Sequence, residues 1–230
     1  MKKYDKNEKF SFTQGAYPTI ELIKKNPHIV KEIIYDDGFN EIEKLKALCK
    51  KNNIILRQSK KEVIRLSNRK NDYVIGVFEK HEKKLYDGNH IILENIENMG
   101  NLGTIIRTMA ALDYRNLALI GKTCDYFNPK VIRASMGSFF DVNIERFDTI
   151  FDYKKKFQNE IYSFMLDDKA QKLSKIEKKK PFSLAFGNEG SGLTDEFRKF
   201  NTVKIEQRDL VDSMSIQIAS AIGMYEFKEF

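Results

Sequence analysis

A single arginine and a glycine-rich loop are the parts of this 230-residue chain whose residue types best fit a ligand site. Arg107 falls opposite the apolar face of the helix expected around it, so it would face the cleft where open α/β sheets bind ligands. Residues 187–192, GNEGSG, follow an apolar run, and glycines let a ligand approach the backbone closely. The loop contains no lysine, so it suits a ligand that reads backbone amides and carbonyls better than a phosphate.

The element that must position Arg107 is a strand, loop and helix over residues 90–113. Residues 90–93, HIIL, predict a buried strand, and the Asn and Gly of residues 95–101 predict a turn. Asn101 is expected to be the N-cap of the helix. The buried face of that helix carries Leu102, Ile105, Ile106, Met109 and Leu112. On this stretch alone, an ordinary strand–helix unit with a solvated arginine is an equally good interpretation.

Two later stretches accompany this unit in order. Residues 184–193, LAFGNEGSGL, predict a strand and a glycine-rich loop, and residues 212–226, DSMSIQIASAIGMYE, predict a loop and an apolar helix. Together the three stretches resemble the three motifs of the SpoU/TrmH family of SPOUT methyltransferases, and residues 133–137, RASMG, also fit its pattern. The matching residues are Asn101, Gly103 and Arg107 in the first motif, Gly187, Glu189, Gly190, Gly192 and Leu193 in the second, and Ser213 in the third.

The resemblance implies a two-domain α/β protein. Its C-terminal SPOUT domain would contain a parallel sheet with a deep trefoil knot, and a small α/β substrate-binding domain would precede it. It also implies S-adenosylmethionine as the cofactor, RNA as the partner, and a homodimer formed by the knot region. The reaction would be methyl transfer to a ribose 2′-hydroxyl of RNA, with rRNA favoured over tRNA.

The resemblance also implies a set of site residues. Those that would bind the cofactor are Gly187, Asn188, Gly190, Ile205, Ser213, Met214 and Ser215, and the catalytic residues would be Arg107, Asn101, Glu189 and Ser213. Because arginine is effectively always protonated, we favour Arg107 as a stabiliser of the forming alkoxide and a clamp on the adjacent phosphate. Asn101 and Glu189 would orient Arg107 and the sugar.

The third motif departs from the family, which usually has Ser-Leu-Asn where this chain has Ser213, Met214 and Ser215. A Pro-Met pair of the family is likewise replaced by Glu206-Gln207. The alternative is therefore an RNA-binding protein of the same fold that has lost catalysis. A dinucleotide-dependent dehydrogenase is excluded, because residues 98–103, NMGNLG, fail the Gly-x-Gly-x-x-Gly spacing.

The net charge of +7 is concentrated in the first third of the chain. Residues 1–80 carry 18 Lys and Arg against 11 Asp and Glu, whereas residues 81–230 carry 22 of each. This excess favours a contact with a polyanion, with solubility as the alternative reading. Two distant cysteines and three scattered histidines predict no metal site and a reduced, cytoplasmic protein. The sequence contains no run of eighteen apolar residues, so we expect no membrane-spanning segment.

Composition and pattern divide the chain into three parts. Residues 1–80 predict a basic α/β RNA-binding domain, with residues 1–11 disordered, and the charged residues 81–89 predict a linker. Residues 90–230 predict the methyltransferase domain, in which strands alternate with helices as in a parallel sheet. We expect a strand over residues 139–144 and a terminal helix from Ser213 that is buried on most sides, since it carries no polar stripe.

Overall fold

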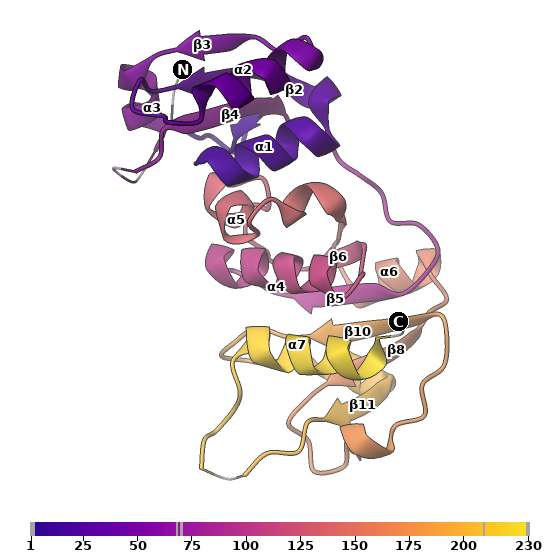
Figure 1. The fold of residues 1–230 in the computed structure, drawn as a ribbon. Coiled ribbons are helices and arrows are strands. Elements are labelled where there is room, and N and C mark those ends of the chain that lie inside the picture. The colour runs from indigo at the N-terminus through magenta and orange to yellow at the C-terminus, as the bar shows by residue number, and fades with distance from the viewer. Residues whose placement is uncertain (1–2, 68, 70, 209, 229–230) are drawn as a thin grey trace. The chain divides into compact units, whose positions relative to one another are not determined.

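The computed structural model describes residues 3–67, 69, 71–208 and 210–228, and these residues divide into two compact units (Figure 1). The N-terminal unit comprises residues up to 81 together with residues 125–141, and the C-terminal unit comprises residues 82–124 and 142 onward. The sequence places residues 125–141 in the methyltransferase domain, whereas the structure packs them with the N-terminal unit. No helix of the described residues is long and apolar enough to cross a membrane.

The described part of the N-terminal unit is built on a four-stranded sheet in the order β1-β4-β2-β3, in which only β2 and β3 are parallel. Side chains alternate between its two faces, so Ile33 packs with α2 residues and Ile34 packs with α3 residues. The elements are β1 (Phe10–Phe12), α1 (Ala16–Lys25), η1 (Pro27–Ile29), β2 (Val30–Tyr35), α2 (Ile42–Lys51), β3 (Leu56–Gln58), α3 (Lys60–Leu66) and β4 (Val74–Glu79).

The start of the chain is more ordered than its polar composition predicts. Phe10 and Ser11 lie in β1 and pair with Glu79 and Phe78 of β4. The expected disorder of residues 1–11 is therefore wrong for these two residues, because a strand edge supplies backbone partners that a local pattern does not reveal. Residues 1–2 lie outside the described part of the chain.

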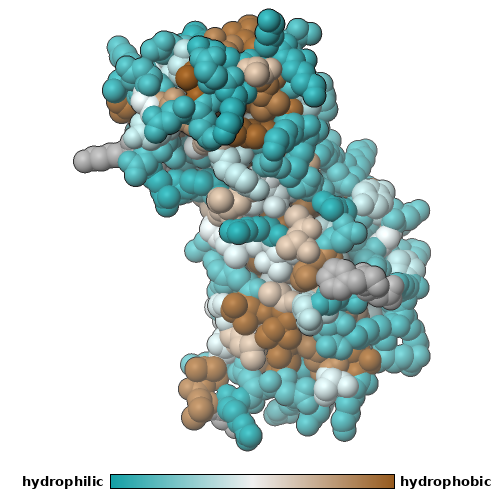
Figure 2. Space-filling model, in the orientation of Figure 1, coloured by the Kyte–Doolittle hydropathy of each residue, from teal (hydrophilic) through white to brown (hydrophobic). Residues whose placement is uncertain are grey.

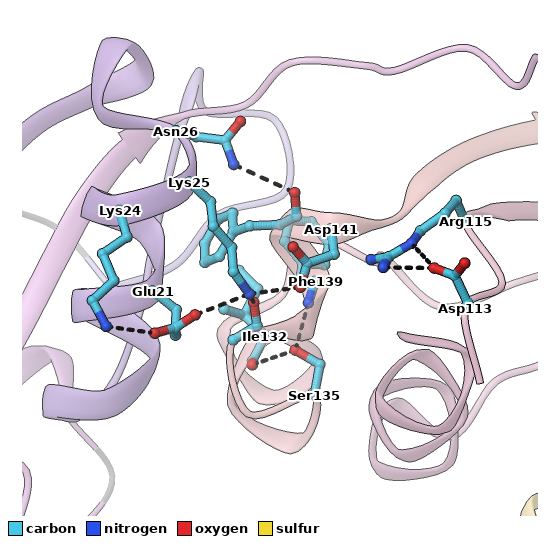
Figure 3. Close-up of polar contacts among 12 residues, drawn as sticks. Glu21, Lys24, Lys25, Asn26, Asp113, Arg115, Ile132, Ser135, Phe139 and Asp141 are labelled. Atoms are coloured by element: carbon cyan, nitrogen blue, oxygen red, sulfur yellow. Dashed lines mark hydrogen bonds and ion pairs between the residues drawn. The ribbon is translucent and has the colours of Figure 1, made fainter. Parts of the chain in front are cut away.

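Polar contacts hold residues 125–141 within the N-terminal unit (Figure 3). The ammonium group of Lys25 lies 2.6 Å from Asp141 Oδ2 and 3.0 Å from Glu21 Oε2. Asn26 Nδ2 donates to the carbonyl oxygen of Phe140 at 3.4 Å. Residues 125–141 contain α5 (Pro129–Ala134) and the 3₁₀ helix η2 (Ser138–Asp141). The strand expected over residues 139–144 is therefore wrong for residues 139–141, and the strand begins only at Asn143, as β7 (Asn143–Phe147).

The C-terminal unit contains, in its described residues, a seven-stranded sheet in the order β7-β6-β5-β10-β8-β11-β9. All of its pairings are parallel, as the alternation of strands and helices predicts. The strands are β5 (His90–Glu94), β6 (Asn116–Ile120), β7 (Asn143–Phe147), β8 (Glu160–Phe164), β9 (Gln171–Lys172), β10 (Phe182–Phe186) and β11 (Asn201–Lys204). The helical elements are α4 (Met99–Ala111), α6 (Ile150–Lys156), η3 (Leu173–Lys175), η4 (Asp195–Lys199) and α7 (Ile216–Phe227).

Neighbouring side chains of β10 face different helices across the parallel sheet. Ser183 hydrogen-bonds through its hydroxyl to the hydroxyl of Tyr153 on α6 at 2.6 Å. Its neighbour Phe182 packs against Phe227 of α7, with ring centroids 5.1 Å apart. A Cβ atom at Gly223 would lie 2.8 Å from the nearest aromatic ring, so this position of α7 lies very close to the sheet. Helices on both faces explain why the strands of β5, β6 and β10 are fully buried.

Two helix starts differ from the expectations. The N-cap of α4 is Asn98, whose Oδ1 accepts from the backbone N–H groups of Gly100 and Asn101 at 2.8 and 3.1 Å. The expected cap at Asn101 is therefore wrong, and the Asn101 side chain is available for other contacts. The last helix, α7, begins at Ile216 rather than near Ser213.

The C-terminal helix is less buried within one chain than its composition predicts. Ile218 and Tyr225 are 54% and 62% exposed. Figure 2 shows hydrophobic side chains gathered at the surface over α7. Part of the apolar surface of α7 is therefore exposed to solvent in the single chain.

Candidate active site

A cavity of about 400 Å³ lies in the C-terminal unit, on the side of the sheet where β8, β10 and β11 end. Its walls are the loop 187–193, the aromatic side chains of Phe164 and Phe186, and residues 212–214 before α7. This volume lies in the range of small-molecule sites, which combine apolar walls with a few polar groups.

The glycine-rich loop is folded back on itself by its own backbone. The N–H of Asn188 donates to the carbonyl of Gly192 at 3.1 Å, and the N–H of Gly192 donates to the carbonyl of Asn188 at 2.9 Å. A Cβ at Gly187 would lie 2.0 to 2.3 Å from backbone atoms of Gly192 and Leu193. Only glycine leaves room for this close approach, which explains why the loop starts with that residue.

Two polar side chains attach this loop to the sheet. Asn188 donates through Nδ2 to the carbonyl of Asn95 at 3.0 Å, and its Oδ1 accepts from the N–H of Gly190 at 2.8 Å. The buried carboxylate of Glu94, at the end of β5, accepts from both the N–H and the hydroxyl of Thr194 at 2.8 Å. The loop is therefore anchored at both of its ends.

Three side chains from three elements form a hydrogen-bonded chain beside the cavity. Asn101 of α4 donates through Nδ2 to Glu189 Oε1, and Gln217 of α7 donates through Nε2 to Asn101 Oδ1. Glu189 lines the cavity, whereas Asn101 and Gln217 do not. The sequence predicts that Asn101 and Glu189 orient Arg107, but the two side chains bond to each other, and no hydrogen bond among the described residues joins either of them to Arg107. Gln217 is not among the site residues that the sequence predicts.

Arg107 lies on the exposed side of α4, opposite the buried stripe, as its spacing predicts. It does not line the cavity. Among the described residues, Arg107 makes no hydrogen bond or ion pair, so its guanidinium is available to an incoming anion.

Most of the predicted cofactor-binding residues surround the cavity. Those in its wall are Gly187, Asn188, Gly190, Ile205, Ser213 and Met214. Ser215 is not part of the wall; it forms the N-cap of α7 without a side-chain cap hydrogen bond. The roles of these residues in binding stay predictions.

Arg198 also lines the cavity, but its charge is already compensated. Its Nε donates to Asp195 Oδ1 at 2.8 Å, and a second nitrogen pairs with Asp167. The hydrogen bond to Asp195 and the charge of Asp167 raise the pKa of the Arg198 guanidinium. Arg198 therefore offers no free guanidinium to an anion in the cavity. This agrees with a loop that presents backbone groups to a ligand rather than binding a phosphate.

The described residues contain no cluster of three or more His, Cys, Asp or Glu that could hold a metal ion.

Gln217 and Glu94 are the site residues that sequence reasoning missed. Gln217 is the only amide side chain in residues 216–225 of an otherwise apolar helix, and that isolation is the signal that could have identified it. Glu94 directly follows the apolar run of β5, where a buried carboxylate requires hydrogen-bond donors.

Comparison with known proteins agrees with this geometry. The model of the SpoU rRNA Methylase family matches residues 88–225. A Synechocystis protein called an uncharacterized tRNA/rRNA methyltransferase is 31% identical over 140 residues, which are 59% of this chain and 51% of that protein. A 23S rRNA guanosine 2′-O-methyltransferase of Bacillus subtilis is 28% identical over 159 residues, which are 64% of this chain and 61% of that protein. The chain therefore matches only about half to three fifths of the length of these relatives.

A solved structure extends the likeness to nearly the whole chain. The rRNA methyltransferase of Sinorhizobium meliloti, solved with AdoMet bound, superposes with a TM-score of 0.80 at 27% identity. The superposition covers 95% of this chain and 86% of that one. Because the family model spans more than half of the chain and includes the cavity loop and most of α7, this protein belongs to the SpoU rRNA methylase family.

Proposed function

We propose that this protein transfers a methyl group from S-adenosylmethionine to a ribose 2′-hydroxyl of RNA, with rRNA as the favoured substrate. The main support for the proposal is the arrangement of groups around the cavity. A cavity walled by the glycine-rich loop adjoins a Glu189–Asn101 pair, and α4, which supplies Asn101, also carries the uncompensated Arg107. The names of the Bacillus and Sinorhizobium proteins support the choice of reaction, cofactor and rRNA.

The residues around the cavity fit S-adenosylmethionine. The rings of Phe164 and Phe186 give the cavity an aromatic wall suited to a planar base, and the open backbone of residues 187–192 offers amides and carbonyls. Asp212, Ser213 and Met214 complete the wall near α7. When bound, the cofactor supplies an electrophilic methyl group on a sulfonium.

The chain's own residues would prepare the ribose. The 2′-hydroxyl is a weak nucleophile unless its developing negative charge is stabilised. Arginine is too weak an acid to serve as a general base, so the proposed role of Arg107 is to stabilise the forming alkoxide and to hold the adjacent phosphate. Glu189, oriented by Asn101, accepts a hydrogen bond from the sugar. Ser213 lines the cavity, and its hydroxyl is proposed to hydrogen-bond to the sugar. The proton leaves to the phosphate or to bulk water.

The rest of the molecule supplies the RNA contact and the dimer in this proposal. The charge excess of residues 1–80 supports the N-terminal unit as the RNA-binding part. The exposed Ile218 and Tyr225 of α7 support a homodimer that covers this helix. Action on RNA agrees with the cytoplasmic location that the cysteine usage predicts.

The test is transfer of tritium from labelled S-adenosylmethionine to total RNA from a strain that lacks this protein. We expect label in one RNA size class, with the modified site resistant to alkaline cleavage, and none with Arg107→Ala. A wild-type chain that binds RNA but neither binds the cofactor nor transfers label would contradict the proposal. That result would establish the alternative, an RNA-binding protein of this fold.

A further inference from the structure

Gln217 occupies the second position of α7 and bonds to Asn101, which in turn bonds to Glu189 of the cavity wall. Its Nε2 donates to Asn101 Oδ1, and Asn101 Nδ2 donates to Glu189 Oε1. The chain of three side chains therefore crosses from α7 through α4 to the loop after β10. Gln217 is half-buried, so water competes only in part for these groups.

The direction of both hydrogen bonds follows from the chemistry of the end residue. An ionised carboxylate can only accept, so Asn101 must present its NH₂ group to Glu189. The carbonyl oxygen of the Asn101 amide then faces Gln217, and Gln217 must in turn present its own NH₂ group. The Asn101 amide could also lie rotated by 180°, with its NH₂ group toward Gln217. The hydrogen bond that Gln217 donates to the Asn101 oxygen disfavours that orientation, and loss of the donor removes this preference.

The backbones that carry these side chains are held firmly. The cap at Asn98 fixes the first turn of α4, from which Asn101 projects. The Tyr114 hydroxyl, just beyond α4, donates to the carbonyl of Met224 in α7 at 3.0 Å. The two helices also pack against each other. Gln217 is therefore presented from a rigid element, as a group that orients a reactive site should be.

We infer that Gln217 is a positioning residue for methyl transfer, which orients Glu189 by fixing the amide of Asn101. The inference rests on the proposed function. Gln217 does not line the cavity, and its side chain bonds to Asn101, so its effect would pass through Asn101. The expected effect is on the rate of transfer and not on binding of the cofactor, because the loop 187–193 holds the cavity without it.

The test compares Gln217→Met and Gln217→Glu with the wild type in the tritium assay on total RNA. Gln217→Met keeps the length of the side chain and removes the donor, so we expect kcat to fall by about tenfold at every pH. The KM for S-adenosylmethionine should stay within about twofold of wild type. Gln158→Glu is the matched control, because the Gln158 side chain lies just after α6 and bonds, among the described residues, only to the Lys154 carbonyl.

Gln217→Glu provides the readout that a purely structural role would not produce. A carboxylate at this position cannot donate to Asn101 Oδ1, whereas a protonated carboxyl can. The nearby Glu189 disfavours a second negative charge and raises the pKa of the introduced group. The activity of Gln217→Glu relative to wild type should therefore rise by about tenfold between about pH 8 and about pH 5.5. The ratio for Gln158→Glu should stay flat.

A second measurement separates this inference from the proposed function. The side-chain NH₂ resonances of Asn101, identified by their loss in Asn101→Asp, should titrate with pH in Gln217→Glu and not in the wild type. A wild type without methyl transfer would refute the proposed function, while this titration would still establish that Gln217 orients Asn101. Full activity in Gln217→Met, or an activity ratio for Gln217→Glu that does not change with pH, would overturn the positioning role.

Discussion

The close turn at Gly187 makes the sharpest stability prediction for the site. In Gly187→Ala the new Cβ would lie 2.0 Å from the carbonyl carbon of Gly192 and 2.1 Å from the nitrogen of Leu193. Ordinary contact distances are about 3.5 Å or more, and the obstructing atoms are backbone rather than the end of a flexible side chain. The loop must therefore open by more than an ångström.

Opening the loop has a definite energetic consequence. It breaks the two backbone hydrogen bonds between Asn188 and Gly192, each of which contributes about 1 kcal/mol. Residual overpacking adds about 1 to 3 kcal/mol. We therefore expect Gly187→Ala to lower the free energy of unfolding by about 3 to 5 kcal/mol. The same movement displaces one wall of the cavity, so the affinity for S-adenosylmethionine should fall by more than about tenfold.

Urea unfolding and calorimetric titration with S-adenosylmethionine would measure the two effects. The matched control for stability is Gly190→Ala in the same loop, where a Cβ would meet only Asn188 Oδ1, at 3.5 Å. We expect that variant to unfold within about 0.5 kcal/mol of the wild type. Equal unfolding free energies for Gly187→Ala and Gly190→Ala would refute the reasoning, because both positions of the loop would then accept a Cβ.

Three further predictions follow from neighbouring groups. Arg107→Ala should abolish methyl transfer, while calorimetric titration should show an unchanged affinity for the cofactor, because Arg107 does not line the cavity. A loss of affinity as large as the loss of activity would contradict this prediction. Glu94→Gln should weaken cofactor binding by about tenfold, because an amide cannot accept both hydrogen bonds from Thr194; wild-type affinity would count against an anchoring role. Burial lowers the pKa of His90, whose ring hydrogen-bonds to Tyr153. The stability that it contributes is full above its unfolded pKa of about 6.5 and is lost as the pH falls below that value. Urea unfolding should show this slope in the wild type and a smaller one in His90→Gln.

Local patterns predicted the elements on which the site is built. The spacing of apolar residues along α4 places Arg107 on the exposed side, and the helix repeat alone decides that. The buried strands β5 and β10 were likewise readable, because continuous apolar runs are typical of parallel sheets with helices on both faces. The ordered motifs then sufficed to indicate the family.

Tertiary contacts overruled local patterns elsewhere. The short strand β1 forms because the edge of β4 offers it partners about seventy residues away. Asn98 and Asn101 are equally good caps by residue type, and the structure uses Asn98 because Asn101 bonds to Glu189 and Gln217. The apolar circumference of α7 suggested burial on most sides, yet Ile218 and Tyr225 remain exposed in one chain. The trefoil knot stays a prediction from the family resemblance.

By itself, the sequence determined the helix and the buried strands that carry the predicted site residues, because helix and strand periods are properties of neighbouring residues. It therefore identified Arg107, Asn101, Glu189 and the glycine-rich loop. Only the tertiary structure decided how these groups meet. Asn101 is 116 residues from Gln217 and 88 from Glu189, and no local pattern specifies a hydrogen bond over such separations. The packing of α4 against α7 and the order of strands in the sheet bring them together, and both depend on the whole fold.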